Sequence, residues 1–181
     1  PPPPLQCPPP PPQNHADKHS VPTRRSSDLT VRSLDYAEVI ELYEMRAVLE
    51  GTAARLAARA ASEVELSELA ALNAELASAP AGAPAQELNR QFHRTLLDAA
   101  RNRFLVKSVS ALQKTLLILG PSTLTDPTRA VDAVAEHAAV LQALQARDGS
   151  AAEIAMRAHV EAALSVRIRG MRGREIPMED E

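Results

Sequence analysis

Apolar residues recur at three- and four-residue steps from about Tyr36 onward, and this spacing is the period of an amphipathic α-helix. The first such run contains Val39, Leu42, Leu49, Ala53, Leu56 and Ala60. Ser62 and Glu65 then have the spacing of a capping box, in which two side chains accept hydrogen bonds from otherwise unpaired backbone amides. The pattern therefore predicts one helix from about Tyr36 and a second that begins after Ser62.

Glycine and proline divide the rest of the chain into further helical segments. A proline and glycine cluster at residues 80–84 ends the second helix, and Gly120 and Pro121 interrupt the chain before a polar loop that runs to Pro127. The periodic segments predict helices over residues 85–100, 103–119 and 128–147, and a sixth after a turn at 148–150 that ends near Arg169. About six amphipathic helices with short connections predict an all-α fold, an antiparallel bundle in which consecutive helices are neighbours.

The first 29 residues do not share this pattern. Ten of the fifteen prolines lie within residues 1–22, where proline removes backbone donors and allows only polyproline II or disordered chain. Residues 19–29, HSVPTRRSSDL, resemble the translation of one reading frame of a sequencing-library adapter, and the alternative is a genuine Ser/Arg-rich linker. We therefore expect a disordered, non-native tail over residues 1–29, a helical domain over residues 30–175 and a disordered C-terminus over residues 176–181.

Composition and motifs narrow the function classes. A net charge of −3 predicts no basic surface for nucleic acid, and the single cysteine, Cys7, excludes an internal disulfide and favours a reducing cytoplasm. No apolar run reaches the roughly 20 residues of a membrane-spanning helix. The chain also lacks a phosphate-binding loop, a nucleophile elbow and an HExxH motif. We therefore expect a cytoplasmic protein that contacts no membrane and is not an enzyme.

Three histidines outside the tail provide the main candidate chemistry, because each falls on the apolar side of its predicted helix. His93 lies one turn after Asn89 in a stripe that contains Phe92. His137 and His159 likewise share faces with aliphatic residues of the last two helices. Three imidazoles and one amide oxygen in a bundle interior suit a divalent transition metal such as zinc, nickel, cobalt or iron.

Spacing alone leaves two interpretations of these residues equally supported. A single buried histidine is more often a core residue that bonds to a backbone carbonyl than a metal ligand. Arg46, beside the apolar stripe of the first helix, is also open to two interpretations. It either pairs with Glu50 one turn later or presents its planar donors to the carboxylate of a ligand.

Three segments of the chain resemble a known family. They are ELYEMRAVLEGTAARLAARAAS, LNRQFHRTLLDAARN and EHAAVLQALQARDGSAAEIAMRAHVEAAL. In order and separation they are similar to helices of the FCD domain, the C-terminal ligand-binding domain of FadR-type GntR transcriptional regulators. The resemblance covers about Leu34 to Arg169.

The resemblance implies a metal site and an effector. Metal-binding members of the family use an Asp or Asn, a His one turn later and two further histidines, which correspond here to Asn89, His93, His137 and His159. Zinc is the first expectation, with nickel, cobalt, iron or manganese as alternatives, and Asn in place of Asp removes one negative charge from the ligand set. Arg46 matches the arginine of the first helix that contacts a small carboxylate, hydroxy acid or sugar acid effector.

The family also implies a homodimer in which the effector changes the binding of operator DNA by a preceding winged helix-turn-helix domain. Residues 1–29 cannot form such a domain, so we expect it to be absent and operator contact to occur only through that missing part. A metal-dependent helical-bundle enzyme and a metal-free structural interaction module stay open as alternatives. The enzyme lacks an obvious general base, because Glu136 and Glu161 are expected to point away from the adjacent imidazoles.

Overall fold

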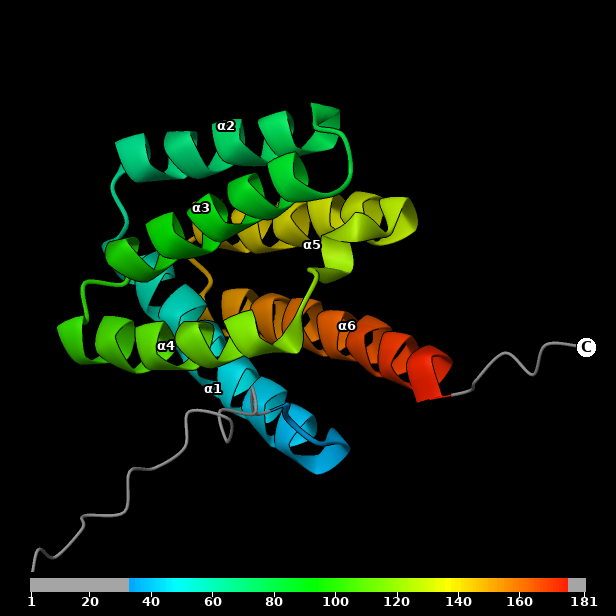
Figure 1. The fold of residues 1–181 in the computed structure, drawn as a ribbon. Helices are drawn as coiled ribbons and strands as arrows, with labels where there is room; N and C mark the ends of the chain where they lie inside the picture. Colours follow the sequence, from blue (N-terminus) through cyan, green and yellow to red (C-terminus); the bar gives the residue numbers. More distant parts are fainter. Residues whose placement is uncertain (1–32, 176–181) are drawn as a thin grey trace, which may run out of the picture. The chain divides into compact units, whose positions relative to one another are not determined.

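The computed structural model describes residues 33–175, and these residues form helices and loops without a β-strand (Figure 1). The helices are α1 (Tyr36–Ala60), α2 (Glu63–Ser78), α3 (Ala83–Ala99), α4 (Arg103–Leu116), α5 (Pro127–Gln145) and α6 (Gly149–Glu175). Two short 3-10 helices, η2 (Leu117–Leu119) and η3 (Thr123–Thr125), lie between α4 and α5. The all-α prediction is confirmed. The predictions for residues 1–29 and 176–181 lie outside the described part of the chain.

Local sequence signals set where several helices begin. Asp35 and Ser62 cap α1 and α2 with complete capping boxes, in which Glu38 and Glu65 accept hydrogen bonds from the backbone amides of the capping residues. Asp126 caps α5 directly before a proline in its first turn. The capping box predicted at Ser62 is therefore confirmed.

The two longest helices, α1 and α6, form the most extensive helix pair, and α5 packs beside α6 (Figure 1). Glycines allow α1 and α6 to approach closely. A Cβ atom at Gly51 would lie 2.9 Å from Cγ of Arg157, and one at Gly149 would lie 3.0 Å from the carbonyl oxygen of Arg55. The α2–α3 pair packs against α5 and α1, so the described helices enclose a common interior.

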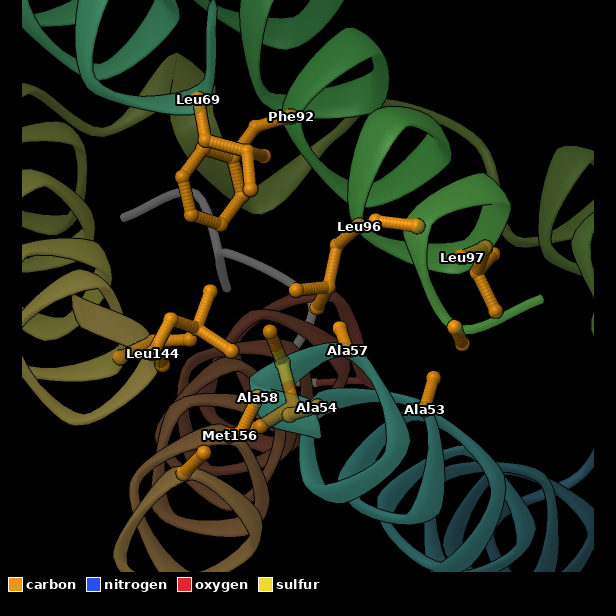
Figure 2. Close-up of a cluster of buried hydrophobic side chains, with 14 of the residues drawn as sticks. Ala53, Ala54, Ala57, Ala58, Leu69, Phe92, Leu96, Leu97, Leu144 and Met156 are labelled. Atoms are coloured by element: carbon orange, nitrogen blue, oxygen red, sulfur yellow. The ribbon is translucent and has the colours of Figure 1, made fainter. Parts of the chain in front are cut away.

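The main hydrophobic core lies where α1, α3, α5 and α6 meet. Figure 2 shows Phe92 and Leu96 of α3, Leu144 of α5 and Met156 of α6 gathered around one face of α1. That face consists of four fully buried alanines, Ala53, Ala54, Ala57 and Ala58. Short side chains on α1 thus leave the room that the larger side chains of the other helices fill.

One prediction about the arrangement is wrong. Short connections do make α2 and α3, and α5 and α6, neighbours, but α1 packs mainly against α6 and not against α2. Only Ala61 and Ser62 connect α1 to α2, and both have extended backbone that turns the chain away from the α1 axis. The period of apolar residues predicts that a helix has a buried face, but it does not identify the helix that covers this face.

Two segment boundaries also differ from the predictions. Helix α6 extends to Glu175 instead of ending near Arg169. The predicted polar loop before Pro127 contains η3, whose Leu124 is buried in a small second core with Leu76, Ala85 and Ala133. Among the described helices, none combines the length and the apolar character that crossing a membrane requires.

Arg147, in the turn between α5 and α6, contacts both the end of α1 and the start of α2. Its guanidinium donates to the carbonyl oxygens of Ala61 at 2.6 Å and Ala58 at 3.5 Å and pairs with Glu63 at 2.6 Å. It thereby satisfies carbonyls that the end of a helix leaves unpaired. We expect Arg147→Ala to lower the free energy of unfolding in urea by about 1–2 kcal/mol. Arg59→Ala removes an exposed arginine from the last turn of α1, and an equal loss in that control would contradict this role.

Candidate metal centre

The three histidines converge from three helices in the interior of the bundle. His93 lies on α3, His137 on α5 and His159 on α6, and one ligand atom from each lies within 4.8 Å of the others. Their side chains are buried, with 4%, 0% and 3% of the residue surface exposed, respectively. All three therefore point inward, as their spacing predicts, and the group could hold a metal ion.

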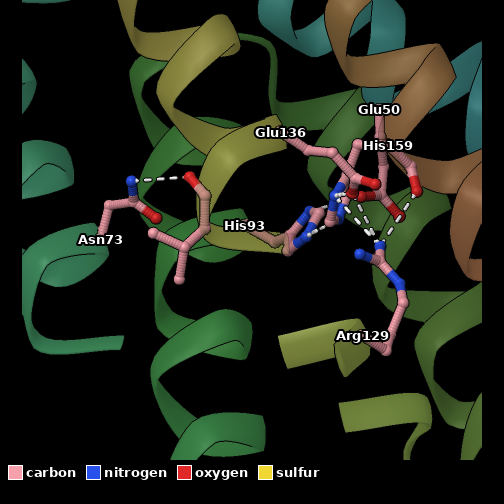
Figure 3. Close-up of polar contacts among 7 residues, drawn as sticks. Glu50, Asn73, His93, Arg129, Glu136 and His159 are labelled. Atoms are coloured by element: carbon pink, nitrogen blue, oxygen red, sulfur yellow. Dashed lines mark hydrogen bonds and ion pairs between the residues drawn. The ribbon is translucent and has the colours of Figure 1, made fainter. Parts of the chain in front are cut away.

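The imidazoles of His93 and His159 face each other, and a carboxylate contacts the far nitrogen of each ring (Figure 3). The Nε2 atoms of His93 and His159 lie 3.1 Å apart. Nδ1 of His159 shares a hydrogen bond of 2.7 Å with Oε2 of Glu136, and Nδ1 of His93 lies 2.7 Å from Oε2 of Glu50. The second contact is at ion-pair distance, but its angles fall short of a hydrogen bond. Both contacts leave Nε2 as the atom that faces the centre.

His137 lacks such a carboxylate partner. Its ring stacks on Phe92 with the ring centroids 3.9 Å apart, and neither ring nitrogen has a hydrogen-bond partner. An imidazole that is fully buried with both nitrogens unpaired has lost its contact with water without a replacement, which costs free energy. A metal ligated by one of these nitrogens would remove part of that cost.

The donor set fits a divalent transition metal. Zinc–nitrogen bonds of about 2.0–2.1 Å separate two tetrahedral ligands by about 3.3 Å, and the two facing Nε2 atoms are 3.1 Å apart. Asn89, one turn before His93 on α3, has a buried side-chain oxygen without a partner. Burial, the largest cause, lowers the pKa of both His137 and His159. These two imidazoles are therefore neutral near pH 7, the form that binds metals.

The metal-free protein should lose stability as the pH falls below about 6.5. In the unfolded chain His137 and His159 bind protons near pH 6.5, whereas their pKa values are lower in the folded protein. The unfolded state therefore binds more protons, and the free energy of unfolding should decline by up to about 2.7 kcal/mol per pH unit. Glu50, whose pKa is lowered, adds a loss only below about pH 4.5. The raised pKa of Glu136 has the opposite effect, because the folded state then binds more protons than the unfolded state at this residue. It is a single group, so the two histidines set the direction of the change in stability.

Urea denaturation with a chelator present, at about pH 7, 6 and 5, measures this dependence. His159→Gln removes one of the two responsible groups and should reduce the slope by about half. A free energy of unfolding that does not change over this range would contradict the neutral, buried state of the two imidazoles.

Glu50 and Arg46 form a buried ion pair on α1. Nε of Arg46 donates to Oε1 of Glu50 at 2.9 Å, and the Glu50 side chain is 2% exposed. Burial alone would raise the pKa of Glu50, but the charge of Arg46, together with the contact with His93, outweighs burial and holds the pKa well below its usual range. Of the two interpretations of Arg46, the pair with Glu50 is therefore present. The pair does not exclude ligand binding, because Arg46 also lines a cavity.

The expectation that Glu136 points away from the imidazoles is wrong. Glu136 directly precedes His137 on α5, but its side chain reaches across to His159 on α6 and also accepts a hydrogen bond from Arg129 at 2.8 Å. Burial raises the pKa of Glu136, and the charge of Arg129 offsets only part of this effect. Glu161 is exposed, in agreement with its prediction.

Arg129 is a site residue that the sequence analysis missed. It is 2% exposed, and besides its bond to Glu136 it lies 3.4 Å from the carbonyl oxygen of His159. Two of its nitrogens, Nε and one terminal nitrogen, have no partner. Arg129 and Glu136 are seven residues apart, and this two-turn spacing on one helix face is a signal that could have identified the pair. A buried guanidinium with unused donors suits an anionic ligand.

A cavity of about 480 Å³ lies beside the histidine cluster, and His93, Asn89 and Glu50 form part of its wall. Residues of α1, α3, α4, α6 and segment 116–124 contribute most of the remaining wall. Its cationic lining residues are Arg46, Arg90, Lys114, Arg129 and Arg167. Glu50 is the only carboxylate among the described lining residues. This imbalance of charge favours an anionic ligand.

These features define a class of protein: a helical ligand-binding domain in which side chains suited to metal binding lie beside a cavity lined by cations. Residues 41–162 match the family model of the FCD domain, the FadR C-terminal domain, and the chain belongs to this family. The FCD domain is the ligand-binding domain of GntR-type regulators and has a regulatory, not a catalytic, role. No curated protein gives a match to the chain.

Proposed function

We propose that this FCD domain binds a divalent metal through Asn89, His93, His137 and His159 and senses a small organic acid in the adjoining cavity. The observation that carries the proposal is the convergence of three buried imidazoles beside a cavity lined by cations. A bound metal would supply positive charge and open coordination positions for the oxygen atoms of the acid. Imidazole ligands favour zinc, with nickel, cobalt, iron or manganese as alternatives.

Three further side chains, two carboxylates and one amide, support this arrangement around the metal. Glu50 and Glu136 contact Nδ1 of His93 and His159, which orients Nε2 of each ring toward the centre. The unpaired, buried side-chain oxygen of Asn89 is available as the fourth protein ligand. Since this ligand is a neutral amide, the metal keeps more of its positive charge to attract an acid.

Arginines of the cavity wall would hold the carboxylate of the acid. Nε of Arg46 donates a hydrogen bond to Glu50, and Arg46 also lines the cavity. Arg129 lines the same cavity and has two nitrogens without partners. Planar guanidinium groups bind carboxylates through two parallel hydrogen bonds. These contacts suit a small carboxylate, a hydroxy acid or a sugar acid.

Acid binding would act on DNA through a change in populations. The acid favours one arrangement of the helices, and a cytoplasmic homodimer passes this arrangement to the winged helix-turn-helix domains of the regulator. The domain itself would contact operator DNA only through those domains. The FCD domain would drive this change because it binds the acid more tightly in one arrangement of its helices than in the other.

Calorimetric titration of zinc-loaded and zinc-stripped full chain with lactate, gluconate and other small acids tests this proposal. We expect at least one acid to bind the zinc-loaded protein, at least about tenfold more tightly than the stripped protein. Arg46→Lys keeps the charge but removes the planar donors, so it should weaken acid binding without changing zinc content. Arg94→Gln, on the exposed face of α3, is the control. Equal affinity without zinc, or no binding by any acid, would contradict the proposal.

A further inference from the structure

The cavity is longer and carries more positive charge than a single small carboxylate requires. We infer that its ligand is an elongated acid of about six carbons with a negative group at each end. One end lies at the histidine cluster, and the other lies against Arg167 and Lys114. This inference rests on the proposed acid sensing and specifies the class of acid.

The length follows from the helical residues of the wall. His159 lies behind this wall, with its Nε2 atom 3.1 Å from that of the lining residue His93, and on α6 the lining Arg167 follows His159 by eight residues, about 12 Å along the helix axis. On α3, the lining extends from His93 back to Gln86, which corresponds to about 10 Å. A three-carbon acid is only about 4 Å long. A six-carbon diacid, with its carboxyl carbons about 6 Å apart and a contact of about 3 Å at each end, spans about 12 Å.

The charges at the two ends differ in how the protein compensates them. Near the histidines, Arg46 is paired with Glu50 and Arg129 with Glu136. At the other end, Arg167 and Lys114 have no carboxylate within ion-pair distance among the described residues. The positive charges without a neighbouring carboxylate therefore lie at the end of the cavity that is away from the histidine cluster.

Arg167 also has a donor that the protein leaves unused. One terminal nitrogen donates to the carbonyl oxygen of Leu119 at 3.3 Å, but Nε is buried and has no hydrogen-bond partner. A buried charged donor without an acceptor is costly. A carboxylate or phosphate that accepts from Nε would remove this cost. Lys114, in the last turn of α4 and five residues before Leu119, would add a second positive charge near Arg167.

The wall between the two ends is suited to a carbon chain. Ala163 lies on α6 midway between His159 and Arg167, and Leu116, Leu117 and the ring of Tyr43 contribute further apolar surface to the cavity. The ligand that matches this order of surfaces has an anionic group, a short aliphatic segment and a second anionic group. The second group is a carboxylate or a phosphate, because both accept from guanidinium and ammonium donors.

The first test compares adipate with its monomethyl ester on the zinc-loaded full chain by calorimetry. The two probes have the same carbon skeleton between their ends, but only adipate has two negative charges. We expect adipate to bind at least about tenfold more tightly, since a hydrogen bond to a charged group contributes this much. A third probe, 5-phosphonopentanoate, distinguishes the source of the second charge. Tighter binding than adipate indicates a phosphate-type group and weaker binding a carboxylate, and both results support a doubly charged ligand if the ester binds least.

Variants locate the second anionic group. Arg167→Gln and Lys114→Gln should each reduce the preference for adipate over the ester, while zinc content and affinity for the ester stay unchanged. Arg103→Gln removes an exposed cation from α4 outside the cavity and should keep the full preference. Equal affinity for adipate and the ester would overturn this inference but leave acid sensing intact. Failure of both probes and of all smaller acids to bind would overturn acid sensing as well.

Discussion

Zinc added to the metal-free protein should raise its melting temperature by about 5–10 °C when free zinc is 100-fold above Kd. Binding to the folded state alone contributes about 2.7 kcal/mol at that ratio, and each kcal/mol shifts the melting of a domain of this size by about 2–4 °C. The structural reason is that His137 has two unpaired nitrogens, while Nε2 of His93 and Nε2 of His159 already lie 3.1 Å apart. Calorimetric melting curves with and without a chelator measure the shift.

Two double variants show whether the shift arises in the interior. His93→Ala with His137→Ala should abolish both the bound zinc and the rise in melting temperature. His15→Ala with His19→Ala removes two histidines that precede the helical domain, and both effects should persist. The metal site would be contradicted by shifts of equal size in the two variants, or by the absence of bound zinc in the unaltered protein.

Glu50→Gln should lower the free energy of unfolding by about 3–5 kcal/mol. The substitution removes one partner of a buried ion pair and leaves the charge of Arg46 in the interior without a counter-charge. Glu50 is 2% exposed and lies 2.9 Å from Nε of Arg46 and 2.7 Å from Nδ1 of His93. Because Gln has almost the same shape as Glu, the loss would come from charge and not from a cavity. Urea denaturation followed by circular dichroism measures it.

Two further variants separate the burial of the charge from other effects. Glu87→Gln breaks an exposed pair with Arg90 on α3 and should change stability little, because water screens that pair. Glu50→Leu combined with Arg46→Met removes both buried charges and should recover much of the loss of Glu50→Gln. Equal losses in the single and the double variant would exclude an unpaired buried charge as the cause.

The helices were predictable because their signals are local. The period of apolar residues identified the helical segments, and the Ser62–Glu65 capping box identified the start of α2. The packing of α1 against α6 was not predictable, because the period of apolar residues does not indicate which helix covers a buried face. The extended backbone at Ala61 and Ser62 separates α1 from α2. The end of α6 at Glu175 also lies beyond the last clear apolar repeat near Arg169.

The candidate site was predictable in part, and the difference lies in how its residues make their contacts. Inward placement of His93, His137 and His159 follows from helical spacing within each segment. The contact of Glu136 with His159 does not, since it joins α5 to α6. Arg129 was missed in part for the same reason: its pair with Glu136 lies within α5, but its contact with the backbone of His159 joins α5 to α6.

Helix positions, caps and the inward faces of the three histidines are properties of short segments, in which hydrogen bonds and side-chain period connect residues three or four apart. The convergence of the imidazoles, the burial of the Arg46–Glu50 pair and the cationic cavity are properties of the packed bundle. They depend on which helix covers which face, and that choice is made by the sum of many apolar contacts between residues distant in the chain.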